Sequence, residues 1–250
     1  MYYMHFVSLL AIFKNETMNL KVWLDHYLWQ GVEHFYLIDN GSSDEPLTIL
    51  QEYIDRGLVT YYVLLERHKQ SEHYRHVFDN ENMKEKTKWL IVCDLDEFFF
   101  GIHVRLSTYL QQMDHVNAIY SQWYMFGSSG LVDHPSDIRL SITHRKEKTW
   151  QEDVKYIFQT AAIETSAHLW VHYLLDFHDG VYMDNHNIRI NHYVVQSLEY
   201  FTKVKMVRGD ADRTAGEYAR TMEYFERANE GATIYDDTLK QIIEHTPENY

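Results

Sequence analysis

The sequence lacks the usual marks of a secreted or membrane protein. Its single cysteine, Cys93, excludes an intramolecular disulfide and fits a reducing compartment, so we expect a cytoplasmic protein. No run approaches the roughly 18 apolar residues of a membrane span, which predicts no transmembrane segment. Residues 1–10 have no basic n-region and contain His5 and Ser8, so we expect no signal peptide.

Basic residues are also scarce relative to acids. The 23 lysines and arginines stand against 37 aspartates and glutamates, which gives a net charge of −14. This balance argues against nucleic acid and anionic membranes as partners. A phosphorylated ligand would therefore need a local basic cluster or a metal ion. Aromatic residues, by contrast, are plentiful, with 20 tyrosines and 6 tryptophans, and such amphipathic rings suit both core packing and sugar binding.

The first hundred residues alternate between apolar strands and amphipathic helices. The expected strands are 6–13, 34–38, 58–65 and 90–93. Helices are expected after each of the first two strands and within residues 66–88, before the fourth strand. Gly31 and Gly57 are placed to end the first two helices, and Asp44 or Ser43 to cap the second. This order predicts βαβ units and a parallel sheet.

The second half of the chain is less regular. We expect strands at 118–126, 156–158 and 187–193, a flexible turn at 127–130, a long loop at 131–153, helices at 194–207 and 213–229, and a helical tail to about residue 244. No repeat, low-complexity tract or linker divides the 250 residues. A single domain over residues 1–250 is therefore the simplest organisation.

The rest of the chain is organised around an acidic stretch after the fourth strand. The apolar residues 90–93 are followed at once by Asp94, Asp96 and Glu97. Because a strand alternates its side chains, Asp94 and Asp96 leave it on the same side. Their repulsion is relieved if a divalent cation lies between them and a polyanionic ligand, so we predict a metal–phosphate site. The alternative is a solvated acidic turn, but the three phenylalanines at 98–100 indicate partial enclosure.

Two further polar clusters follow predicted strands, at residues 14–16 and from Asp39 to Asp44. In a doubly wound sheet these strand ends lie along one edge, where they can surround one ligand together with the acidic stretch. The carboxylate of Asp39 is suited to accept hydrogen bonds from the N–H groups of a base. For Ser42 and Asp44, capping of the following helix is at least as good an interpretation as ligand contact.

Motifs between about residues 5 and 210 occur in a collinear order that is more specific than any one of them. They are Lys14-Asn15-Glu16, Trp23, Gly31-Val32, Asp39-Asn40 with Ser42 and Asp44, Trp89 with Asp94, Asp96, Glu97 and Phe98, Trp123 with Phe126-Gly127-Ser128-Ser129-Gly130, Lys155 with Ile157, Asn191-His192-Tyr193 with Ser197, Glu199, Phe201 and Lys203, and Arg208-Gly209. In this order the sequence resembles the glycosyltransferase family 2-like and family 92 group.

The resemblance implies a GT-A fold, which has a Rossmann-like, mostly parallel central sheet flanked by helices. It also implies a nucleotide-binding half at about 1–100, an acceptor-binding half at about 101–210, and C-terminal helices at 211–250. The implied reaction transfers a hexose from a nucleotide-sugar donor, usually linked to uridine diphosphate (UDP), to a hydroxyl group of a glycan or protein-linked acceptor. Inversion at the anomeric carbon and a divalent metal cofactor belong to the same expectation.

Mapped onto this sequence, Asp39 resembles the acid that reads the uracil. Asp94 and Asp96 resemble the Asp-x-Asp motif, in which the first acid faces the ribose and the second binds the metal through the diphosphate; both are taken as catalytic. His192 lies where such enzymes often place a last metal ligand. The expected metal ligands are therefore Asp94, Asp96 and His192, and an imidazole among carboxylates favours Mn²⁺ over Mg²⁺.

The other donor contacts that the resemblance implies are Lys14, Asn15, Glu16, Asn40, Asp44, Lys203 and Arg208. Lys203 and Arg208 would offset the charge of the diphosphate, although a solvated helix face is the ordinary interpretation of such residues. The sequence departs from the pattern at Gln196, which replaces a lysine that often precedes the motif serine, Ser197. One phosphate contact is therefore expected to be missing.

Trp123, Phe126 and Gly127 are the expected contacts to the sugar or the acceptor, with core packing as the alternative interpretation. The reaction also needs a base that deprotonates the acceptor hydroxyl. No single residue is assigned to this role. The candidates lie near matched motifs and are Asp133, Asp153, Glu164 and Asp176.

Two other functions stay open. The chain can be a non-catalytic module that binds a sugar nucleotide or a glycan, or an aspartate-dependent phosphohydrolase. The phosphohydrolase is less favoured for two reasons. Such enzymes normally carry Asp-x-Asp after the first strand of the chain, and they normally have threonine or valine at the position of Phe98. The sequence leaves open the sugar, the acceptor and the oligomeric state.

Overall fold

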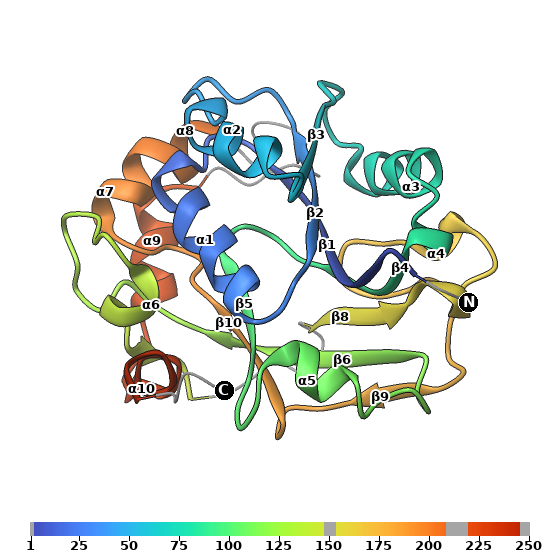
Figure 1. Cartoon of the computed structure of the whole chain (residues 1–250). Helices are drawn as coiled ribbons and strands as arrows, with labels where there is room; N and C mark the ends of the chain where they lie inside the picture. The colour runs from blue at the N-terminus through green and yellow to red at the C-terminus, as the bar shows by residue number, and fades with distance from the viewer. Residues whose placement is uncertain (1–2, 148–153, 209–219, 246–250) are drawn as a thin grey trace.

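The fold is built around one curled sheet that runs from β3 at the top of Figure 1 to β9 at the bottom. A computed structural model describes residues 3–147, 154–208 and 220–245. The strand order is β3-β2-β1-β4-β8-β6-β10-β5, and β9 pairs with β6. Parallel pairs outnumber antiparallel pairs among the described strands of this sheet. The predicted α/β class, with a mostly parallel central sheet flanked by helices, is therefore confirmed.

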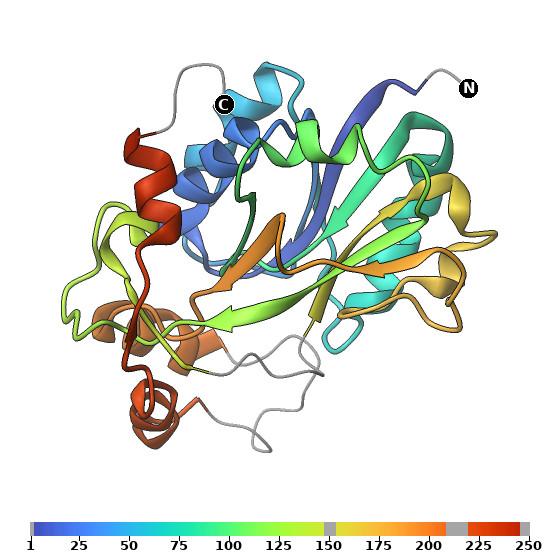
Figure 2. The ribbon, with the colours of Figure 1, turned by 90° about the horizontal axis from the view of Figure 1, so that it is seen from below.

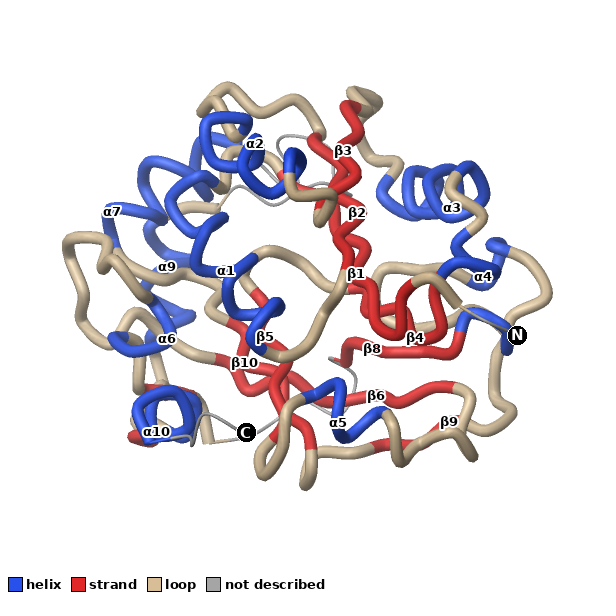
Figure 3. The backbone as a smooth tube through the Cα atoms, viewed as in Figure 1, coloured by secondary structure: helices blue, strands red, loops and turns tan. Residues whose placement is uncertain are grey.

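The first half of the chain forms the predicted βαβ units. Its parallel strands are β1 (His5–Phe13), β2 (His34–Asp39), β3 (Val59–Val63) and β4 (Thr87–Val92). The helices are α1 (Thr17–Trp29) and α2 (Leu47–Asp55) on one face and α3 (Gln70–Asn80) and α4 (Met83–Lys86) on the other (Figure 3). Gly31 and Gly57 follow α1 and α2 with φ angles of 89° and 71°, the conformation in which glycine ends a helix.

Apolar side chains on both faces of the strands explain why helices lie on each side. Along β1, Leu9 and Ala11 join a buried cluster that includes α1, whereas Leu10 and Ile12 join a second cluster that includes α3. Burial on both faces is what a parallel strand between two helical layers requires. Because β1, β2 and β4 run parallel, they end at the same edge of the sheet, and the polar clusters begin at that edge.

The second half completes the sheet by inserting strands out of sequence order. These strands are β5 (Glu97–Gly101), β6 (Ala118–Met125), β8 (Val154–Gln159), β9 (Val181–Met183) and β10 (Ile188–His192). β8 lies antiparallel between β4 and β6, and β6, green in Figure 2, lies beside β10, in orange. β10 in turn pairs antiparallel with β5, so that His192 is the register partner of Glu97.

Several local predictions for this half are corrected. β5, β9 and the short helix α5 (Leu106–Leu110) were not expected. The phenylalanines of β5 are buried on both sides of the sheet, so the strand shows no alternation of polar and apolar residues. The predicted loop at 131–153 contains α6 (Ile138–Ser141), which Asp137 caps, and β7 (His144–Arg145), which pairs with β11 (Ile234–Tyr235). Residues 148–153 of that loop lie outside the described residues.

The helix predicted at 194–207 begins only at Leu198, because the side chain of Ser197 accepts a hydrogen bond from the Tyr200 amide at 3.1 Å and caps it. It consists of α7 (Leu198–Tyr200), a π-helical turn η3 (Phe201–Lys205) and α8 (Met206–Arg208). Further on, the described part contains α9 (Met222–Asn229) and α10 (Thr238–His245). The predicted helix at 213–229 begins outside the described residues. No helix in the described part is long and apolar enough to cross a membrane.

Candidate functional site

The acidic stretch forms a tight connection between β4 and β5, and α1 fixes its backbone. The Trp23 indole N–H donates to the carbonyl oxygens of Asp94 and Glu97, at 3.2 and 3.1 Å. The Tyr27 hydroxyl also donates to the Glu97 carbonyl at 3.0 Å and accepts from the Phe99 amide at 3.0 Å. Because Trp23 and Tyr27 are fully buried, the acids are presented from a rigid base rather than from a solvated turn.

Asp94 is held by a buried lysine that the sequence analysis assigned no role. The Lys155 ammonium, on β8, donates to Asp94 Oδ2 at 2.9 Å and lies 3.5 Å from Glu97 Oε2. The Gln70 amide donates to Asp94 Oδ1 at 3.2 Å. Burial alone would raise the pKa of Asp94, but the charge of Lys155 outweighs it and lowers that pKa. Asp94 is therefore ionised, and 32% of its side chain is exposed to solvent.

Asp96 lies deeper and is paired with two basic groups. The Lys205 ammonium, on the π-helical turn, donates to Asp96 Oδ2, and His192 Nε2 lies 3.5 Å from Oδ1. Burial opposes ionisation of Asp96, but the charges of Lys205 and His192 hold its pKa well below the usual range. Asp96 thus carries a full negative charge inside the protein. Its Oδ1 atom is the carboxylate oxygen that does not accept from Lys205.

Asp96, Glu97 and His192 form a cluster whose possible ligand atoms lie within 4.8 Å of one another. The pairing of β5 with β10 sets His192 opposite Glu97, and the Tyr193 amide donates to the Asp96 carbonyl at 2.8 Å. Glu97 Oε1 and His192 Nδ1 are buried and have no hydrogen-bond partner among the described residues. Burial raises the pKa of Glu97 well above its usual range in spite of Lys155. Two carboxylates, an imidazole and unsatisfied buried atoms fit a divalent cation.

The structure therefore brings two of the three predicted metal ligands together and adds a third. Asp96 and His192 belong to the cluster, whereas Asp94 is paired with Lys155 and its role as a ligand stays a prediction. Glu97 was not proposed as a ligand. Its signal in the sequence was its position directly after Asp96, but its inward direction depends on the pairing of β5, which was not predicted.

Of the residues expected to contact a sugar, Trp123 lies against this cluster. The Trp123 ring lies 4.4 Å from the His192 ring and 5.2 Å from the His172 ring, measured between centroids. Burial, followed by the charge of Lys155, lowers the pKa of His172 to about 4. Phe126 is only 2% exposed and packs against Tyr193, so it belongs to the core. A sugar contact stays a prediction for Trp123.

Comparison with known proteins identifies the family. The model of glycosyltransferase family 92 matches residues 5–242. The chain belongs to glycosyltransferase family 92. A protein of Ricinus communis named as a glycosyltransferase family 92 protein is 23% identical over 96% of this chain and 47% of its own length. A second match with the same name is 24% identical over 78% of this chain and 36% of its own length. The chain thus spans less than half the length of the curated relatives it matches.

Solved structures resemble this family 92 chain only partially. HddC from Yersinia pseudotuberculosis has a TM-score of 0.45 and 14% identity over 80% of this chain and 97% of that chain. Residues 1–349 of TarS from S. aureus have a TM-score of 0.46 and 11% identity over 96% of this chain and 72% of that chain. Nothing about the ligands of this family 92 chain follows from these likenesses.

In this family 92 chain the clusters after β1 and β2 are joined to each other. Asp39 Oδ1 accepts from the Ser42 amide at 2.7 Å, and Oδ2 accepts from the Tyr61 hydroxyl at 2.6 Å. Asp44 does not cap α2, which has no side-chain cap. Instead, its carboxylate accepts from the amide and hydroxyl of Thr17 at 2.9 and 2.8 Å, at the start of α1.

The remaining polar residues of these two loops complete the junction. Asn15 Oδ1 accepts from the Ser43 amide at 2.7 Å, and the Asn40 side chain donates to the carbonyl of Leu64. Asp39, Asp44 and Asn15 thus have structural partners within the protein, and the predicted contacts of Lys14, Asn15, Asn40 and Asp44 to a donor stay predictions.

The basic residues after β10 divide between the surface and the interior. Lys203 pairs with Glu199 at 2.6 Å, and 67% of its side chain is exposed, so it has the surface role named as its alternative. Of the two lysines Lys203 and Lys205, it is Lys205 that contacts Asp96. Arg208 pairs with the buried Glu16 and donates to the Lys14 carbonyl at 2.9 Å.

The structure does not single out a catalytic base among the predicted candidates. Asp133, Glu164 and Asp176 are all solvent-exposed, and within the described part of the chain none of their carboxylates belongs to the Asp96 cluster. Asp153 lies outside the described residues. The identity of the base stays a prediction without a preferred residue.

Proposed function

We propose that this family 92 chain is a metal-dependent glycosyltransferase that moves a hexose from a UDP-linked donor to a hydroxyl group of a glycan or protein-linked acceptor. The observation that carries the proposal is the buried Asp96–Glu97–His192 cluster, in which Glu97 Oε1 has no hydrogen-bond partner among the described residues. The family supports sugar transfer, and the position of the cluster after β4 supports a GT-A fold. Transfer of a hexose and inversion at the anomeric carbon come from the resemblance alone.

The residues of the cluster suit Mn²⁺, with Asp96, Glu97 and His192 as the groups that would hold it. A bound divalent cation offsets the negative charge that develops on the departing diphosphate. Lys155 and Lys205 flank the acids and are the basic groups able to contribute further positive charge. Trp23 and Tyr27 keep the acids in position by holding the backbone of the connection.

Two alternatives predict different reactions. A binding module would hold a sugar nucleotide without turnover, and an aspartate-dependent phosphohydrolase would cleave simple phosphate esters. The position of Asp94 and Asp96 after β4, the fourth strand of the chain, is against the phosphohydrolase, in which this motif normally follows the first strand. The family assignment also favours transfer.

The decisive experiment is a screen of UDP-hexoses for slow hydrolysis without an acceptor, with Mn²⁺ and with excess chelator. We expect at least one donor to be hydrolysed only with the metal, and the same donor to raise the unfolding temperature by mass action. Donor binding without turnover would identify a binding module. Full hydrolysis in excess chelator would show that the lysines alone offset the diphosphate charge, and the metal assignment would be wrong.

The predicted role of Asp39 at the uracil is tested separately. Asp39→Ala should weaken UDP binding by about 1–3 kcal/mol, the usual cost of losing a charge-assisted hydrogen bond. Tyr61→Phe is the matched control, because it removes the hydrogen bond that Tyr61 makes to Asp39 and leaves the carboxylate in place. Calorimetry should show weaker binding for Asp39→Ala than for Tyr61→Phe. Equal affinities would mean that Asp39 serves only the turn.

A further inference from the structure

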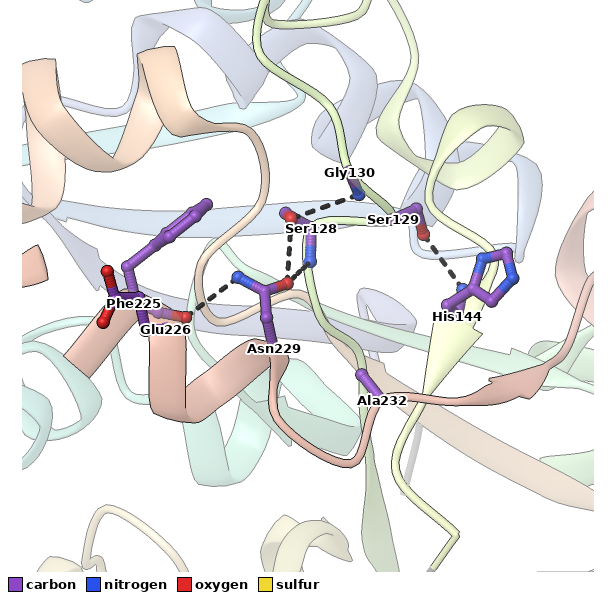
Figure 4. A pocket seen from close by; sticks show the side chains of 8 residues that line it. All are labelled: Ser128, Ser129, Gly130, His144, Phe225, Glu226, Asn229 and Ala232. Atoms are coloured by element: carbon purple, nitrogen blue, oxygen red, sulfur yellow. Dashed lines mark hydrogen bonds between the residues drawn. The ribbon is translucent and has the colours of Figure 1, made fainter. Parts of the chain in front are cut away.

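A cavity of about 570 Å³ lies between the turn after β6 and helix α9 (Figure 4). Its lining includes the hydroxyl groups of Ser128 and Ser129, the imidazole of His144, the ring of Phe225 and the carboxylate of Glu226. No lysine or arginine is among the described residues that line it. The volume falls in the range of small-molecule sites. No residue of the Asp96–Glu97–His192 cluster lines it, so it is a separate hollow.

The walls of this cavity are fixed to each other. Asn229 Oδ1 accepts from the amide and the hydroxyl of Ser128, at 2.6 and 2.8 Å, and Asn229 Nδ2 donates to the Phe225 carbonyl at 2.9 Å (Figure 4). The close approach of α9 requires a glycine at position 127. A Cβ there would lie 2.8 Å from both Ala232 Cβ and Asn229 Oδ1. The cavity is therefore pre-formed rather than a gap between independent segments.

Two polar groups of the lining that stay available are a hydroxyl donor and a carboxylate acceptor. Ser129 Oγ accepts from the amides of Thr143 and His144, at 2.9 and 3.0 Å, so its own proton remains to be donated. The Glu226 carboxylate is exposed and has no hydrogen-bond partner among the described residues. An aromatic face, a hydroxyl donor and a carboxylate acceptor suit a neutral ligand rich in hydroxyl groups. A phosphorylated ligand would instead meet the negative charge of Glu226, and no lysine or arginine is among the described residues that line the cavity.

Two chain segments that form the walls of the cavity also contact the candidate metal site. The Phe126 amide donates to the His192 carbonyl at 3.0 Å, and Ser128 follows two residues later, at most about 7 Å further along the chain. On the opposite wall, the Phe225 ring packs on Phe201 with centroids 5.1 Å apart. Phe201 begins the π-helical turn that carries Lys205 to Asp96.

We propose that this cavity binds a neutral carbohydrate and holds the acceptor glycan beside the Asp96–Glu97–His192 cluster. Carbohydrate binding follows from the lining itself. The acceptor role rests on the proposed function, because only a transferase needs a second sugar at this position.

The test begins with a glycan array that carries neutral and anionic glycans, and continues with NMR titration of the best-bound neutral oligosaccharide. We expect neutral glycans to bind and to shift the amide signals of residues 128–130 and of α9. Glu226→Gln should weaken binding about tenfold, because a charge-assisted hydrogen bond becomes a neutral one. Glu223→Gln is the control, since Glu223 is exposed on the same helix but does not line the cavity. Ala232→Trp, whose side chain would occupy part of the cavity, should weaken binding further.

The outcomes separate this proposal from the proposed function. An array without neutral ligands, a preference for anionic glycans, or equal affinity in the Glu226→Gln and Glu223→Gln variants would overturn the cavity assignment. Metal-dependent donor hydrolysis by the wild-type chain together with any of these results would leave the transferase intact. Neutral glycan binding without donor hydrolysis would support the cavity and refute its acceptor role.

Discussion

Asp96→Asn is expected to lower metal-dependent donor turnover by about 100- to 1,000-fold, the usual loss when one preorganised charge-stabilising group is removed. Asp96 is the acid of the cluster whose pKa is held well below its usual range, so it is ionised at neutral pH, whereas burial raises the pKa of Glu97. The substitution is nearly isosteric and keeps an oxygen near Lys205. The loss is measured as the rate of UDP-hexose hydrolysis with Mn²⁺.

The same substitution leaves the Lys205 ammonium buried without its counter-charge, and this effect must be separated from catalysis. The double variant Asp96→Asn with Lys205→Met removes both charges and should recover most of the lost stability. Its turnover should stay low, because the metal ligand is still missing. Asp114→Asn is a suitable control, since Asp114 pairs with Lys88 at the surface and should be fully active. A double variant with restored turnover would mean that Asp96 acts only as a structural counter-ion.

The part of the fold that could be predicted from sequence depends on local patterns. In β1 to β4, buried runs are separated by amphipathic helices and glycines, and each signal lies within a short window. β5 could not be found in this way, because Phe98, Phe99 and Phe100 are all buried and the strand owes its existence to pairing with β10, about 90 residues away. The antiparallel insertion of β8 between β4 and β6 likewise depends on contacts between residues far apart in the sequence.

The candidate site shows the same division. Asp94 and Asp96 could be predicted because three acids directly after an apolar strand form a local signal. Lys155 carried a weaker signal, as a charged residue in an otherwise apolar strand, which calls for a buried partner. Lys205 could not be predicted, because the π-helical turn at 201–205 changes which side chains point inward. Helical periodicity alone therefore gives no reason to prefer Lys205 over the exposed Lys203.

One buried carboxylate, that of Asp236, links β7, β10 and the start of α10, and its removal should have the largest effect on stability. Asp236 Oδ2 accepts from Arg145 Nε at 2.5 Å and from an Arg189 guanidinium nitrogen at 2.6 Å. Its Oδ1 accepts from the hydroxyl of Thr238 at 2.8 Å, at the start of α10. Burial would raise the pKa of Asp236, but its hydrogen bonds and the charge of Arg189 outweigh it and hold that pKa well below the usual range.

Asp236→Ala should lower the free energy of unfolding by about 3–5 kcal/mol, because it leaves two largely buried arginines without their shared counter-charge. Urea denaturation at pH 7 is the appropriate measurement. A carboxylate whose pKa is lowered by folding contributes its full stabilisation above the pKa of the unfolded chain, near 4, and loses it as the pH falls below that value. The difference between wild type and Asp236→Ala should therefore shrink in acid.

Asp237→Ala supplies the matched control for this prediction. Asp237 is the next residue, and its carboxylate accepts from the exposed Tyr235 hydroxyl at 3.2 Å and from the Gln241 amide at 2.8 Å, without a buried arginine. Its loss should cost no more than about 1 kcal/mol, as for other exposed polar contacts. If the two variants unfold at the same urea concentration, the ion pairs of Asp236 do not stabilise the packing of β7, β10 and α10. The contacts of Arg145 and Arg189 with the Tyr124 ring would then have to account for the packing of this region.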